Sequence, residues 1–142
     1  SAQIVAHSAD LYVLAVGTND VRSREKKICA LDTQTYIDNI DMLIKKVQEQ
    51  KPEAKFVLLS PWLALANDPY TAVPIVERDA LLQEYGDALR ACSQLKGHCF
   101  INPNPAIAEV LRRYVPTDYL LDHIHPNAAE GIRLYSTKVL TQ

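Results

Sequence analysis

"LYVLAV", residues 11–16, is the stretch that indicates the fold most directly: a continuous apolar run that ends at Gly17. Its length and its valines favour a β-strand that is buried on both faces. Two later runs, "KFVLLS" at 55–60 and "HCFIN" at 98–102, predict two further short strands. Because strands of this kind are hydrophobic on both faces, we expect helices to cover both sides of the sheet.

The segments between these runs carry apolar residues at spacings of three and four, which is the pattern of an amphipathic helix. The pattern predicts helices over 32–51, 76–96 and 105–114, and a last helix within 125–142. Alternating strands and helices imply parallel strands joined by right-handed crossovers. The sequence therefore predicts an α/β fold with three layers, α/β/α, around a parallel sheet. The last helix should turn an apolar face to the core, made of Ile132, Leu134, Tyr135, Val139 and Leu140.

Length, charge and cysteines restrict the class of protein. The chain has 142 residues and a formal net charge of −2, with both signs mixed along it. This length fits one domain over residues 1–142, and the charge argues against a nucleic-acid partner, which usually selects a basic protein. No apolar run reaches the ~18 residues of a membrane span. Cys29, Cys92 and Cys99 have no regular spacing, so we expect free thiols, with a Cys92–Cys99 bridge as the alternative.

Three strands are few for this architecture, since a doubly wound sheet usually has about five or more. A small parallel sheet with residues 11–16 as its first strand would leave an apolar edge or face poorly covered. We therefore expect part of the sheet to lie outside these 142 residues, upstream in the natural chain or in a partner chain. Such an edge also leads us to expect that copies of the chain associate with one another.

Polar loops follow the predicted strands. "GTND", residues 17–20, comes after the first strand, and "SPW", residues 60–62, comes after the second. "DHIHPN", residues 122–127, follows the third strand and its short helix. Because functional sites of parallel sheets form at the carboxyl ends of the strands, we expect these three loops to open on one edge.

G-x-N-D after an apolar strand, followed about a hundred residues later by D-x-x-H before the last helix, resembles the SGNH (GDSL-type) hydrolase superfamily. The resemblance implies a flavodoxin-like fold and an esterase or acyltransferase that acts on an acyl ester, such as an acetylated carbohydrate or a lipid. It assigns Asp122 as the triad acid, His125 as the general base and Asn19 as the oxyanion donor, with the backbone of Gly17 and Asn19 on the oxyanion side. It requires no metal and no organic cofactor.

These residue types suit that chemistry. An imidazole with a pKa near neutrality can take the proton of a serine hydroxyl, and a carboxylate can fix its tautomer and stabilise the imidazolium. The amide of Asn19 can donate to a developing oxyanion, an interaction that contributes ~2.7–4 kcal/mol in a comparable acyl-transfer enzyme. The three-residue spacing of Asp122 and His125 lets both lie in one tight turn.

The family's nucleophile block, G-D-S, does not occur in the chain. In the family that serine follows the first strand of the sheet, whereas residues 11–16 correspond to the third. We therefore expect the nucleophilic serine to lie outside these residues, with Ser60, at a strand end, as a weak internal candidate. The alternative function is a catalytically inactive SGNH-like domain that serves as a binding or interaction module.

Simpler interpretations of the same residues remain open. Asp122 can be the N-cap of the last helix, with Pro126 in its first turn. Gly17 can simply end a strand while Asn19 makes a turn. Asp122, His123 and His125 can also be read as metal ligands.

Two residues near these loops are candidates for substrate contact. Arg22, in the basic stretch after "GTND", is predicted either to face an anionic acyl group or charged sugar, or to be a solvated loop residue. Trp62 is predicted either to stack on a substrate ring or to pack in the core. Tyr135 is treated as a packing residue.

Overall fold

The computed structural model describes residues 8–62, 71–113, 118–122 and 125–141. Within these residues seven elements follow one another, and their order confirms the predicted alternation. Their bounds are β1 (Leu11–Leu14), α2 (Thr33–Gln50), β2 (Lys55–Leu59), α3 (Ile75–Lys96), β3 (Cys99–Ile101), α4 (Asn104–Arg113) and α5 (Glu130–Leu140).

The three strands form one parallel sheet in the order β1-β2-β3. Leu11 of β1 pairs with Lys55 of β2, and Leu58 of β2 pairs with Phe100 of β3. The predicted parallel arrangement is therefore confirmed, although the strands are shorter than the apolar runs suggested. Because all three strands run in the same direction, the loops that follow them leave from one edge of the sheet.

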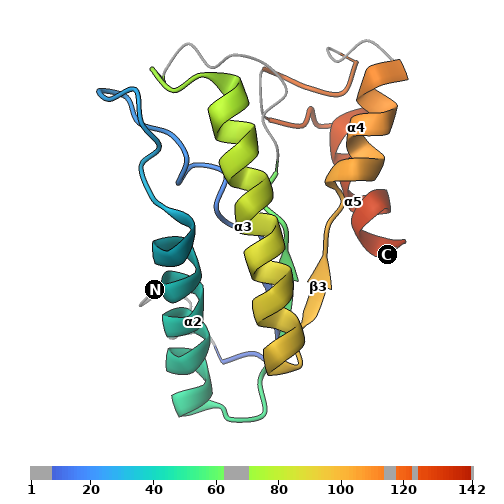
Figure 1. The fold of residues 1–142 in the computed structure, drawn as a ribbon. Coiled ribbons are helices and arrows are strands. Elements are labelled where there is room, and N and C mark those ends of the chain that lie inside the picture. Colours follow the sequence, from blue (N-terminus) through green and yellow to red (C-terminus); the bar gives the residue numbers. More distant parts are fainter. Residues whose placement is uncertain (1–7, 63–70, 114–117, 123–124, 142) are drawn as a thin grey trace.

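Helices α2 and α3 lie side by side across one face of this sheet (Figure 1). Asp32 caps the start of α2 by accepting a hydrogen bond from the Thr35 backbone N–H at 2.7 Å. The rings of Tyr36 and Tyr85 stack between the two helices with centroids 4.1 Å apart. Each fully buried apolar side chain contributes about 1.5–3 kcal/mol to stability. Twelve residues form this core: Leu14, Val21, Tyr36, Ile40, Ile44, Val47, Ala54, Phe56, Leu58, Leu82, Tyr85 and Leu89.

The opposite face of β1 differs from the prediction. Leu11 and Val13 are 55% and 57% exposed. The prediction that both faces of this strand are buried was therefore wrong for the described residues. Successive side chains of a strand point to opposite faces. Leu14 accordingly enters the core beside α2 and α3, whereas none of the described elements covers Leu11 and Val13.

The last helix also departs from its predicted packing. Ile132 and Leu140 are 55% and 83% exposed, while Gly131 is buried. The reason is that α5 packs beside α4, at the side of the molecule away from α2 (Figure 1). The apolar face of α5 is therefore only partly used by the elements that the structure describes.

All three cysteines are free thiols, so the alternative of a Cys92–Cys99 bridge was wrong. Within the described residues, no helix combines the length and the hydrophobicity that a membrane crossing needs.

Candidate active site

The "GTND" segment forms a tight turn that is separated from the end of β1 by two residues. The Asp20 backbone N–H donates to the Gly17 carbonyl at 2.9 Å, which closes the turn. Gly17 has φ +119°, a conformation that favours glycine. A Cβ at this position would lie 2.8 Å from Cγ of Pro61 and 2.9 Å from Cε2 of Tyr36. The turn can therefore approach the loop after β2 closely only because residue 17 has no side chain.

Asn19 is held in this turn by Arg22. One guanidinium nitrogen of Arg22, Nη1, donates to Oδ1 of Asn19 at 2.9 Å. A guanidinium has only donors, so the amide end that faces it must be the oxygen. The donor end of the Asn19 amide, Nδ2, is therefore the end that remains for a ligand. The sequence left Arg22 either at a substrate-facing rim or in a solvated loop, and the structure places its guanidinium on Asn19.

Asp122 and His125 form a paired unit in one turn. Oδ2 of Asp122 lies 2.7 Å from Nδ1 of His125, and Oδ1 accepts from the His125 backbone N–H at 2.8 Å. With Nδ1 occupied by the carboxylate, Nε2 is the ring nitrogen that stays available for proton transfer. The His125 side chain is 64% exposed, so the second nitrogen is accessible from solvent.

The loop that carries this pair is anchored by Asn127. Its backbone N–H donates to Tyr119 O at 2.8 Å, and its Nδ2 donates to Asp118 O at 2.7 Å. Its Oδ1 accepts from the backbone N–H groups of Ala129 and Gly131, at 3.2 and 2.9 Å. Asn127, and not Asp122, therefore satisfies the backbone at the start of α5. The alternative of Asp122 as the cap of that helix was wrong, because its carboxylate is used by His125.

A cavity of about 280 Å³ brings these loops together. Asn19 and His125, which are remote in the sequence, both line it, together with Trp62 from the loop after β2. Asp122 contacts His125 directly, while Gly17 supports the turn that carries Asn19. The described residues that line it are Thr18, Asn19, Trp62, His125, Pro126 and Tyr135.

Trp62 and Tyr135 form an aromatic wall of this cavity. Their ring centroids lie 5.0 Å apart, with an angle of 58° between the planes. Thr18 ties Trp62 to the "GTND" turn, because its hydroxyl donates to the Trp62 carbonyl at 3.1 Å. The indole Nε1 of Trp62 is buried and has no hydrogen-bond acceptor among the described residues. Trp62 therefore both packs and lines the cavity.

Sequence reasoning missed the position of Tyr135. It was assigned to the packed face of the last helix, whereas it lines the cavity from α5. Burial raises the pKa of its hydroxyl. Its spacing on the helix could not distinguish a cavity wall from a core position, because both are inward-facing.

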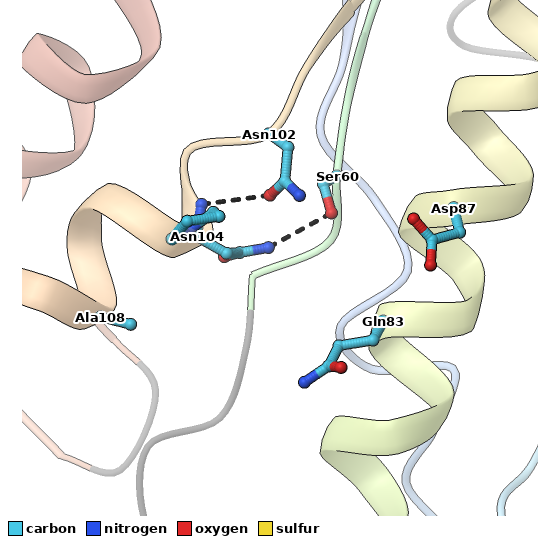
Figure 2. A pocket seen from close by; sticks show the side chains of 7 residues that line it. Ser60, Gln83, Asp87, Asn102, Asn104 and Ala108 are labelled. Atoms are coloured by element: carbon cyan, nitrogen blue, oxygen red, sulfur yellow. Dashed lines mark hydrogen bonds between the residues drawn. The ribbon is translucent and has the colours of Figure 1, made fainter.

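No described serine lines the cavity with His125. Ser60 is 3% exposed, and its Oγ accepts from Nδ2 of Asn104 at 3.2 Å in a different cavity (Figure 2). The hydroxyl of Thr18 does line the first cavity, but its proton is directed to the Trp62 carbonyl. The described part of the chain therefore places an acid, an imidazole and an amide in one site without placing a serine hydroxyl there.

The metal interpretation involved Asp122, His123 and His125, of which His123 lies outside the described residues. Among the residues that the structure describes, no three His, Cys, Asp or Glu side chains gather as metal ligands.

Comparisons with known proteins support the resemblance read from the motifs. The family model of GDSL-like lipases and acylhydrolases matches residues 2–129. A curated acetylxylan esterase of Geobacillus stearothermophilus is 23% identical over 131 residues, which cover 89% of this chain and 56% of the esterase. The chain therefore spans little more than half the length of that relative.

Solved structures agree at the level of the fold. A putative GDSL-like lipase from Parabacteroides merdae matches with a TM-score of 0.76 and 18% identity, over 96% of this chain and 61% of the lipase. A putative acylhydrolase from Bacteroides fragilis matches with a TM-score of 0.68 and 17% identity, over 93% and 60%. The flavodoxin-like α/β fold that the resemblance implied is confirmed by these neighbours.

Proposed function

Because the chain belongs to the GDSL-like lipase/acylhydrolase family, we propose that it supplies the acid, the base and an oxyanion donor of a serine esterase. The observation that carries this proposal is the pairing of His125 Nδ1 with Asp122 at 2.7 Å, in a site whose cavity also contains Asn19.

In the proposed reaction, His125 Nε2 takes the proton of a serine hydroxyl as that oxygen attacks the ester carbonyl. Asp122 keeps the Nδ1–H tautomer and stabilises the imidazolium that forms. His125 then protonates the leaving alcohol, and the acyl-enzyme is released by water or by an acceptor alcohol in a second round of the same proton transfers. Nδ2 of Asn19 donates to the oxyanion, with Arg22 holding the other end of the amide.

The proposed substrate is an acyl ester with a small acyl group. The cavity volume is just below the range usual for ligand sites, about 300–1,000 Å³, and Trp62, Pro126 and Tyr135 give the cavity apolar walls. A short acyl chain such as acetyl fits such a space. The curated esterase relative makes an acetylated carbohydrate the first ester to test, with a lipid ester as the comparison.

The nucleophilic serine is proposed to come from a segment outside these 142 residues that completes the sheet beside β1. The exposed side chains of Leu11 and Val13 support this proposal, because a further strand and its helix would cover them. The greater length of the relatives is consistent with it. We use "complete protein" for this chain together with that segment, whether it is upstream or in a partner chain.

The test is hydrolysis of p-nitrophenyl acetate and of acetylated xylo-oligosaccharides by the complete protein, combined with fluorophosphonate labelling and peptide mapping. His125→Ala should lower kcat by about 10⁴-fold or more and abolish labelling, because the serine then has no base. His98→Gln is the matched control, since His98 lies just before β3, at the end of the sheet opposite the site.

Near-normal turnover of His125→Ala would contradict the assignment of the base. Labelling of a serine within residues 1–142 would contradict the proposed location of the nucleophile while leaving the pair intact. A complete protein that shows neither labelling nor turnover would contradict the esterase function itself.

A further inference from the structure

We propose that a second cavity, between α3 and α4, binds a neutral glycosyl unit. Its volume is about 370 Å³, within the range of small-molecule sites. It opens beside the carboxyl ends of β2 and β3, and none of its lining residues belongs to the cavity of His125. The lining residues are Ser60, Gln83, Asp87, Asn102, Asn104, Pro105 and Ala108.

Two polar walls face each other across this space (Figure 2). Gln83 and Asp87 are one turn apart on α3 and extend from that helix toward the cavity. Ser60, after β2, and Asn104, at the start of α4, form the other wall. A ligand between the walls would therefore meet an amide and a carboxylate on one side, and a hydroxyl and a second amide on the other.

The inner wall is held in place before any ligand arrives. Asn104 is only 6% exposed, and its Nδ2 donates both to Ser60 Oγ at 3.2 Å and to the Pro61 carbonyl at 2.8 Å. Oδ1 of Asn102 accepts from the Asn104 backbone N–H at 3.2 Å. Because Ser60 Oγ accepts from Asn104, the Ser60 hydroxyl proton is the group that it can give to a ligand. Such pre-positioned polar groups favour specific hydrogen bonding.

The outer wall supplies adaptable partners. Gln83 is exposed and carries both a donor and an acceptor. One carboxylate oxygen of Asp87, Oδ1, is 3.2 Å from the Arg90 guanidinium, which leaves Oδ2 to accept from ligand hydroxyls. Carboxylates and amides together match the vicinal hydroxyls of a sugar, each of which both donates and accepts.

Other ligand classes fit this lining less well. None of the described residues that line the cavity is a Lys, Arg or His, and Asp87 would repel a phosphate or a carboxylate. Pro105 and Ala108 are the apolar members of the described lining, and both side chains are small. A single carboxylate is also a poor set of ligands for a divalent cation. An uncharged compound with several hydroxyls therefore fits the described lining best.

The two cavities share one structural element. Ser60 lines the proposed glycosyl site and Trp62, two residues later, lines the cavity of His125. A carbohydrate bound in the second cavity would thus lie next to the site where an ester bond is proposed to be cleaved. Binding itself does not depend on the catalytic proposal, so it can be tested without turnover.

The experiment is a titration of the ¹⁵N-labelled complete protein with xylotetraose or cellotetraose, monitored by ¹⁵N–¹H correlation spectra. The side-chain NH₂ signals of Gln83 and Asn104 report on the site directly and should shift with a millimolar Kd. Gln83→Ala should weaken binding by about fivefold, which corresponds to one hydrogen bond. Gln94→Ala, at another exposed glutamine of α3, is the matched control and should leave the Kd unchanged.

Three results would overturn the proposal. One is the absence of shifts at Gln83 and Asn104 up to the solubility limit of both tetrasaccharides. Another is a response of these signals to inorganic phosphate but not to the sugars, which would identify an anion site. The third is a Gln94→Ala effect as large as that of Gln83→Ala, which would point to a change spread over the whole helix.

Discussion

Arg22 shows how one side chain can be assigned by its contact. From the sequence it was a candidate for meeting substrate at the rim, and the structure instead places its Nη1 2.9 Å from Oδ1 of Asn19. The contact orients an amide whose other end is proposed to bind the oxyanion. A residue that positions a catalytic group affects the transition state more than the binding of the ground state.

We therefore expect Arg22→Ala in the complete protein to lower kcat by about tenfold with little change in KM, less than the loss of an oxyanion donor itself. Arg22→Lys should restore part of the rate, since an ammonium can also donate to Oδ1. Arg24→Ala, on the same exposed loop, is the control. Steady-state kinetics on one ester test this prediction. A raised KM at unchanged kcat would instead show that Arg22 binds substrate.

At the scale of elements, the start of α5 and the loop that carries Asp122 and His125 are one unit. Asn127 joins them, because its side chain contacts Asp118 on one side and the first turn of the helix on the other. Gly131 is part of the same junction, because a Cβ there would collide with the Tyr119 carbonyl oxygen. The geometry of His125 thus depends on how α5 begins.

We expect Asn127→Ala to reduce the free energy of unfolding by about 1–2 kcal/mol, as is usual for the loss of a helix cap. Asn127→Asp should lose less, because Oδ1 can still accept from Ala129 and Gly131. Asn39→Ala, at an exposed position of α2, should be neutral or slightly stabilising. Urea unfolding of the three variants tests this prediction. Equal losses of unfolding free energy in Asn127→Ala and Asn39→Ala would show that Asn127 does not stabilise the start of α5.

For the whole molecule, the consequential feature is the uncovered face of β1. Leu11 and Val13 are more than half exposed on an edge strand of the described sheet, whereas the other face of the same strand packs under α2 and α3. Apolar surface beside an unpaired edge favours association with another chain or segment. The proposed completion of the sheet makes this face interior.

The corresponding prediction compares two forms of the protein. In the 142-residue chain alone, Val13→Lys should reduce self-association in light scattering and change stability by less than about 0.5 kcal/mol. In the complete protein the same charge would be buried, and we expect a loss of several kcal/mol in urea unfolding. Val76→Lys, at a position that is 76% exposed on α3, should be tolerated in both forms. Tolerance of Val13→Lys in the complete protein would show that nothing covers this face.

Local patterns allowed much of this molecule to be predicted from its sequence. The apolar runs, the helical spacing between them and the stops at Pro61 and Gly97 are short-range signals, which is why the element order and the parallel α/β class are confirmed. The pairing of Asp122 with His125 also needs only one turn of chain, so its spacing anticipated the contact. Both belong to what the amino-acid sequence determined by itself.

The tertiary structure alone decided which distant side chains meet. In the structure, Asn19 and His125 line the same cavity, and Tyr135 lines it too, although the sequence predicted a packing role for Tyr135. Ser60 and Asn104 line a separate cavity. The structure also leaves Leu11 and Val13 exposed, although their run reads as fully buried. The physical reason is common to all four: burial and contact depend on which segments pack against a residue, and no local period of the sequence records that.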